Sequence, residues 1–134
     1  MEQRLLKLLA IGHIAAGLLL CLLYFVTPIH TPLLQAVYIA QPTALSNESQ
    51  LIFWLCILGP TIASWGVLFF ALAHQYFLTP TVFLWRCMVA AILIWAPLDS
   101  LLCTLNGIYA GAVGNLAVTI VFLVLLFRIK HLAK

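Results

Sequence analysis

Residues 80–106 read PTVFLWRCMVAAILIWAPLDSLLCTLN, and this stretch decides the class of the protein. No charged residue stands between Arg86 and Asp99. If the stretch is helical, the two charges lie roughly 20 Å apart along the axis. A bilayer's hydrocarbon core is roughly 30 Å thick, so the uncharged part fills most of it. The pattern predicts a membrane-spanning helix over 82–103, with Asp99 as the one acidic side chain at membrane depth.

The composition of the whole chain supports the same conclusion. Of its 134 residues, 66% are hydrophobic and 7% are charged, and the mean hydropathy is +1.20. Soluble domains have about 25% charged and about 45–50% apolar residues. A small soluble fold has too much surface for its volume to hide so many apolar side chains. We therefore expect lipid around the chain and no soluble catalytic domain. The net charge of +3 gives no reason to expect a nucleic-acid partner.

Three further apolar runs predict the remaining membrane spans, at 8–26, 51–73 and 108–127. The first run exceeds the roughly 7–15 apolar residues of a signal peptide, and no small-residue cleavage site follows it, so we expect a permanent helix. The fold expected is all-α: one integral membrane four-helix bundle over 1–134, with an outer loop at 27–50.

Prolines mark two places where the expected spans should bend. Pro60 and Pro97 each remove a backbone donor and displace a carbonyl one turn earlier, which predicts helix kinks. In the loop, Thr31-Pro32 favours the start of a short interfacial helix, and a collapsed apolar loop is the alternative. Asn47-Glu48-Ser49 matches a glycosylation motif, but Asn47 with Gln50 is better interpreted as a capping pair for the next helix.

The basic residues predict the orientation. Four crossings would bring all six Lys and Arg residues to one side, if the Arg86 side chain extends back toward the connection at 74–81. The positive-inside rule makes that side cytoplasmic. We therefore expect both termini in the cytoplasm, and the inner (cell) membrane of a bacterium as the location.

Polar side chains gather at one expected depth. Asp99 and Asn115 are the same number of residues from Gly107, so an antiparallel hairpin places them at the same level, roughly 12 Å from the turn. An ionisable residue inside a membrane predicts function. The candidate ligand- or ion-binding residues around this level are Asp99, Asn115, Ser100, Trp95 and Tyr109. The alternative is structural: Asn115 and Ser100 satisfy Asp99 and fix how the third and fourth spans pack.

Other chemistry-bearing residues have simpler interpretations. The four cysteines include no C-x-x-C pair and suit a small apolar role. Of the four histidines, only His13 and His74 come near a shared depth for haem, and their depths differ, so we expect no metal or cofactor. Small residues at helical spacing, such as Gly12 with Ala16 and His13 with Gly17, predict close helix packing within the chain.

These observations leave two main functional hypotheses. The first is a non-catalytic subunit or assembly partner of a larger membrane complex, because the sequence contains no nucleophile–base pair, metal cluster or soluble module. The alternative is a small transporter or ligand-binding membrane protein that uses the level of Asp99. A membrane enzyme has least support, with only Asp99 and His30 as acid–base candidates. The expected partners are the lipid bilayer and other membrane subunits or a second copy of the chain.

Overall fold

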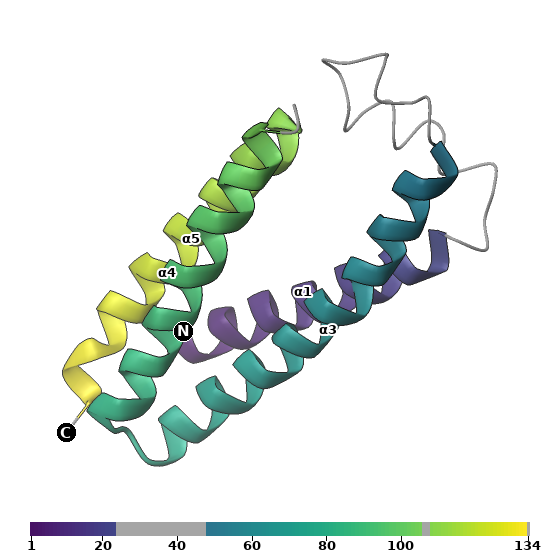
Figure 1. Cartoon of the computed structure of the whole chain (residues 1–134). Helices are drawn as coiled ribbons and strands as arrows, with labels where there is room; N and C mark the ends of the chain where they lie inside the picture. Colours follow the sequence, from purple (N-terminus) through teal and green to yellow (C-terminus); the bar gives the residue numbers. More distant parts are fainter. Residues whose placement is uncertain (24–47, 106–107, 134) are drawn as a thin grey trace.

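The computed structural model describes residues 1–23, 48–105 and 108–133, and these residues are helical without strands (Figure 1). The elements are α1 (Glu2–Leu23), α3 (Glu48–Leu78), α4 (Val82–Leu105), α5 (Tyr109–Ile129) and the short 3-10 helix η2 (Lys130–Leu132). The described residues include four helices long and apolar enough to cross a membrane. The all-α prediction and the number of apolar helices are therefore confirmed.

Some features expected from sequence fall outside the described residues. They are most of the loop at 27–50 with its short helix, the Asn47 cap and glycosylation motif, and the turn at Asn106-Gly107. The structure gives no test of these predictions.

Two helices extend beyond the predicted spans. α1 begins at Glu2, before the predicted span at 8–26, and its Leu6 is fully buried. α3 continues to Leu78, past residue 73 where the predicted span ends, and buries Tyr76 completely. Hydropathy marks where a segment stops being apolar. Backbone hydrogen bonds and packing decide where a helix stops.

The connection between α3 and α4 is short and capped on both sides. The Thr79 amide donates to the Gln75 carbonyl (2.9 Å), which completes the last turn of α3. The Leu84 amide donates to the Thr81 hydroxyl oxygen (3.2 Å), so Thr81 is the N-cap of α4. Pro80 lies between them and ends the first helix. α4 therefore starts at Val82, as predicted.

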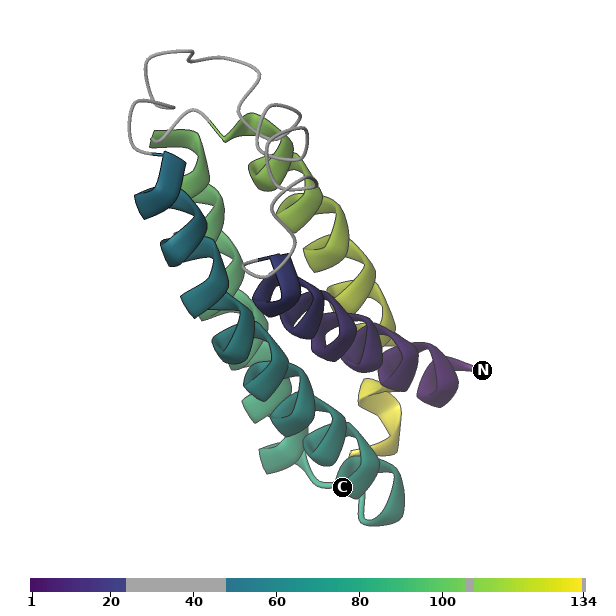
Figure 2. The same ribbon diagram turned by 90° about the vertical axis from the view of Figure 1, so that its right-hand side faces the viewer.

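The helices form two antiparallel pairs. α1 packs along α3, and α4 packs along α5. Figure 1 shows the two pairs meeting at one end and diverging toward the other, and Figure 2 gives the perpendicular view. We call the first end the basic end: it holds the α3–α4 connection together with Lys7, Arg128 and Lys130. The opposite end is the far end.

The buried core lies in the half of the molecule nearest the basic end. Its members come from all four long helices: Leu6, Ala10, Phe69, Ala73, Tyr76, Met88, Ile92, Phe122, Leu125, Leu126 and Ile129. On α4 the last buried residue toward the far end is Ala96, and on α5 the first is Phe122. Among the described residues, α4 beyond Ala96 and α5 before Phe122 therefore contribute no buried side chain.

Glycines bring α1 and α3 into close contact. A Cβ added at Gly17 would overlap the carbonyl of Gly59, and one added at Gly66 would lie 2.9 Å from the carbonyl of Ala10. Small residues allow helix backbones to approach in this way. The predicted close packing of Gly17 is confirmed. Gly12 behaves differently, because a Cβ there meets nothing within 4 Å.

Candidate functional site

Asp99 and Asn115 meet across α4 and α5. The side-chain amide of Asn115 donates a hydrogen bond to Oδ2 of Asp99 (2.5 Å), and both side chains are half-buried. The expectation that the two residues share one depth is confirmed. They lie beyond Ala96 and before Phe122, in the far halves of the two helices.

The residues around this pair are only partly the candidate binding residues that the sequence predicted. The Ser100 carbonyl accepts a hydrogen bond from the Thr104 hydroxyl (2.8 Å), and no described contact joins the Ser100 hydroxyl to Asp99. Tyr109 is the first residue of α5 and is 57% exposed. Cys103, which the sequence did not single out for this level, has its Sγ 4.0 Å from the Asn115 amide nitrogen.

The two prolines lie inside continuous helices. Pro60 is an internal residue of α3, and Pro97 is an internal residue of α4, two residues before Asp99. Helical structure continues through both positions. The kinks stay a prediction.

Trp95 belongs to a second group of residues, nearer the basic end. We call this group the aromatic cluster; it takes rings from all four long helices, namely His13, Trp65, Phe69, Trp95 and Phe122. The imidazole centroid of His13 lies 4.7 Å from Trp65, 5.5 Å from Phe122 and 5.7 Å from Trp95. Tilted and edge-on contacts at such distances are favourable. The imidazole is thereby held in one orientation.

The hydrogen bond made by His13 defines its tautomer. Nδ1 lies 2.9 Å from the carbonyl oxygen of Leu9, one turn earlier in α1. Because a carbonyl oxygen only accepts, Nδ1 must carry the proton. In the neutral ring Nε2 then has a free lone pair. Within the described part of the chain no group donates to Nε2.

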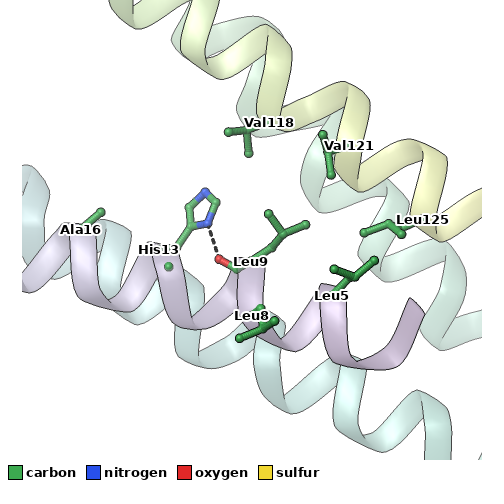
Figure 3. Close-up of a pocket in the computed structure, with 9 residues that line it drawn as sticks. Leu5, Leu8, Leu9, His13, Ala16, Val118, Val121 and Leu125 are labelled. Atoms are coloured by element: carbon green, nitrogen blue, oxygen red, sulfur yellow. Dashed lines mark hydrogen bonds between the residues drawn. The ribbon is translucent and has the colours of Figure 1, made fainter. Parts of the chain in front are cut away.

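A cavity of about 500 Å³ lies beside His13, between α1 and α5 (Figure 3). The residues that line it are Leu5, Leu8, Leu9, Gly12, His13, Ala16, Val118, Val121 and Leu125. In Figure 3 the imidazole rises from α1 toward Val118 of α5. All the other lining side chains are apolar or absent, so His13 supplies the polar side-chain group of this cavity.

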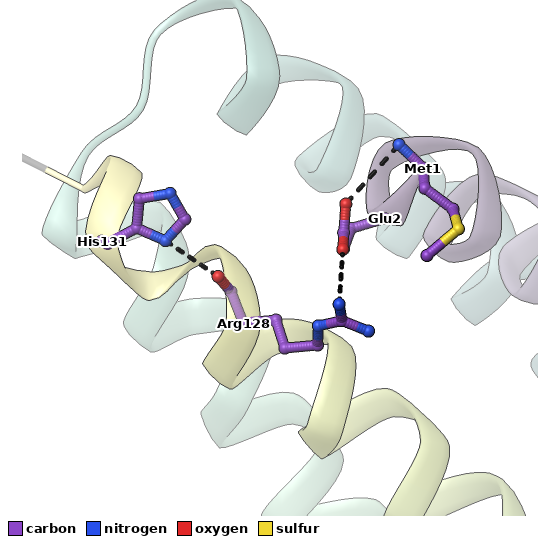
Figure 4. Close-up of polar contacts among 4 residues, drawn as sticks. All are labelled: Met1, Glu2, Arg128 and His131. Atoms are coloured by element: carbon purple, nitrogen blue, oxygen red, sulfur yellow. Dashed lines mark hydrogen bonds and ion pairs between the residues drawn. The ribbon is translucent and has the colours of Figure 1, made fainter.

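The basic end carries contacts that tie the helices together. Lys7 Nζ donates to Nδ1 of His74 (2.9 Å), linking α1 to α3. Glu2 lies between the amino group of Met1 (3.5 Å) and the guanidinium of Arg128 (3.4 Å), linking α1 to α5 (Figure 4). Ion pairs this exposed contribute little to stability. Nδ1 of His74 is thus occupied by Lys7.

Two aromatic donors stabilise the last turn of α5. The amide of Lys130 bonds to the carbonyl of Phe127, in the tighter 3-10 pattern, which leaves the Leu126 carbonyl without its usual helical partner. Trp85 Nε1 donates to that carbonyl (2.8 Å). The Tyr76 hydroxyl donates to the carbonyl of Ile129 (2.8 Å). α3 and α4 therefore hold the end of α5 through backbone acceptors.

Sequence reasoning missed the aromatic cluster, although a signal for part of it was present. Trp65 and Trp95 are the same number of residues from Pro80, so counting along the α3–α4 hairpin places them at one level, as it did for Asp99 and Asn115. Their ring centroids are 5.3 Å apart. Nothing comparable predicts that His13 joins them, because the long segment at 24–47 separates α1 from α3.

Comparisons with protein-family models, curated proteins and solved structures give no match for this chain. In the described ranges no cluster of three or more His, Cys, Asp or Glu side chains is arranged to hold a metal ion. The candidate sites are therefore the Asp99–Asn115 pair and the His13 cavity.

Proposed function

We propose that this chain is a non-catalytic subunit or assembly partner of a larger membrane complex. It would cross a bacterial cell membrane four times with both termini in the cytoplasm. The observation that carries the proposal is the half-buried Asp99–Asn115 pair, because the described parts of α4 beyond Ala96 and of α5 before Phe122, where the pair lies, have no buried side chain.

The physical argument concerns the cost of a carboxylate at membrane depth. Insertion scales give about 2.5–3.5 kcal/mol for an acidic or basic side chain at the centre of a membrane helix. One hydrogen bond from Asn115 uses a single donor, whereas an ionised carboxylate has about four acceptor positions. A neighbouring membrane protein with a hydrogen-bond donor at this level would satisfy the rest. It would also cover the apolar side chains around the pair.

Two exposed leucines near the pair would contact such a partner. Leu102 on α4 and Leu116 on α5 are each 58% exposed and lie within one turn of the pair along their helices. Lipid alone could cover both leucines. It could not supply fixed donors to the acceptor positions of Asp99 that no described residue fills, and this difference favours a protein partner.

Site-specific photocrosslinking in the native membrane tests the proposal. A benzoylphenylalanine at position 102 or 116 should give a discrete protein adduct, whereas one at Leu68, 66% exposed on α3, should give none. Replacing Asp99 by Ala should reduce the adduct at both far-end positions. The same weak labelling at all three positions, unchanged by the Asp99 replacement, would overturn the proposal.

A second candidate function rests on the same carboxylate. If the chain is a small transporter or ligand-binding protein, Asp99 would bind a cation or a polar head group, with Asn115 orienting it by the 2.5 Å hydrogen bond. Asp99→Asn separates the two functions, because it keeps a hydrogen-bonding group and removes the charge. Under this reading the variant loses cation-dependent transport in proteoliposomes. Under the subunit reading it still gives the protein adduct.

A further inference from the structure

The Nε2 atom of His13 is a polar atom in an otherwise apolar cavity between α1 and α5. Nδ1 is committed to the Leu9 carbonyl at 2.9 Å, so the lone pair on Nε2 is available. The cavity has a volume of about 500 Å³, within the roughly 300–1,000 Å³ typical of small-molecule sites. The only groups that could enter it from lipid are themselves apolar, or apolar with a polar end.

The aromatic cluster fixes the imidazole of His13, so its Nε2 acceptor is preorganised. Trp65, Trp95 and Phe122 contact the imidazole from three different helices. They do not line the cavity, so they hold the ring in place and leave the cavity empty of their own side chains. A side chain held in this way loses little freedom when it binds a ligand.

We propose that this cavity binds a membrane-soluble molecule that has an apolar body and a hydroxyl group. The hydroxyl donates a hydrogen bond to Nε2 of His13, and the body lies between α1 and α5 against Leu9, Val118 and Val121. The tautomer sets the requirement for a donor: an ether or ester oxygen brings only lone pairs and would be repelled by the one on Nε2. Phenols and long-chain alcohols both meet this requirement.

The test uses matched ligands with and without the hydroxyl proton. The purified full chain in lipid nanodiscs is titrated with 4-octylphenol and with its methyl ether, and in parallel with 1-dodecanol and its methyl ether. Binding to empty nanodiscs is subtracted. A net hydrogen bond of about 1 kcal/mol corresponds to roughly fivefold tighter binding of the hydroxyl compound. Tighter binding of the hydroxyl compound in the phenol pair or in the alcohol pair identifies whether the cavity binds phenols or long-chain alcohols.

Variants locate the effect at His13. His13→Phe keeps a ring in the aromatic cluster and removes the acceptor, so the preference for the hydroxyl should fall to about one. Gly12→Leu places a side chain in the cavity and should weaken both members of a pair. Gly114→Leu is its matched control, because a Cβ at either glycine meets nothing within 4 Å and Gly114 does not line the cavity.

A spectroscopic readout keeps the test independent of how well His13→Phe folds. In the wild-type chain with ¹⁵N-labelled histidine, the Nε2 resonance of His13 should shift when 4-octylphenol is added and should stay unchanged with the ether. Equal affinity for both members of each pair would show that the cavity holds acyl chains only and would overturn the proposal. An Nε2 resonance that does not shift when 4-octylphenol is added would have the same consequence.

Discussion

At the residue scale, single polar side chains decide how the helices of this protein are joined. Asp99 and Asn115 connect α4 to α5 at 2.5 Å, while Tyr76 and Trp85 donate to carbonyls at the end of α5. Where side chains are shielded from water, each of these groups has few alternatives to its protein partner. Their hydrogen bonds therefore specify geometry more than they add bulk stability.

The Asp99–Asn115 bond should show coupling in a double-mutant cycle. Asp99→Ala and Asn115→Ala are each expected to destabilise the fold, and the double variant should lose less than the sum by about 1 kcal/mol. Unfolding in mixed micelles of dodecylmaltoside and increasing SDS measures the four proteins. Strict additivity would mean that the two side chains do not interact in solution.

Tyr76→Phe should isolate the hydrogen bond to the Ile129 carbonyl. The ring stays and the buried acceptor loses its donor, so the free energy of unfolding should fall by about 1 kcal/mol. Tyr109→Phe is the matched control, because Tyr109 is 57% exposed and is expected to tolerate the change. The same SDS titration compares them, and equal stability of the two variants would argue against the Tyr76 contact.

At the scale of helices, glycines determine which face of α1 meets α3. Gly17 and Gly66 lie where the backbones approach, whereas Gly12 lies on a face of α1 that borders the cavity. The sequence showed small residues on both faces of this helix. It could not tell them apart, because the rotation of α1 about its axis depends on what α3 and α5 present to it.

Leucine substitutions should separate the two faces. Gly17→Leu has no room beside the Gly59 carbonyl, so we expect a loss of roughly 1–3 kcal/mol or failure to fold. Gly12→Leu should fold with nearly wild-type stability. Thermal unfolding in detergent, followed by far-UV circular dichroism, gives both values. A Gly12→Leu variant as unstable as Gly17→Leu would contradict this assignment of the faces.

At the scale of the whole molecule, two helix pairs share one core near the basic end and diverge beyond it (Figure 1). Met1 and the last described turns of the chain lie near each other, as the Glu2–Arg128 contact shows. The N-terminus and the end of α5 thus lie at one end of the molecule with the basic residues; in a membrane, the positive-inside rule would place that end in the cytoplasm.

Labelling of single cysteines tests this topology. In a variant without the native cysteines, Glu2→Cys and Leu132→Cys should both react with a membrane-impermeant maleimide only after the membrane is opened. Val113→Cys, in the far half of α5, serves as the comparison and should stay unreactive in lipid. Termini that react from opposite sides of the membrane would exclude four crossings.

The sequence by itself determined that the described residues are helical, with four membrane-length helices among them, and that Asp99 and Asn115 lie at one level. Both results follow from local quantities, namely the hydropathy of a segment and a fixed rise per residue from a nearby turn. Only the tertiary structure decided that His13 is enclosed by rings from three other helices, and that the pairs diverge beyond the core. Those outcomes depend on how each helix is tilted and rotated against its neighbours. Because these helices are apolar on every face, the sequence has no polar stripe from which the rotation of each helix could be predicted.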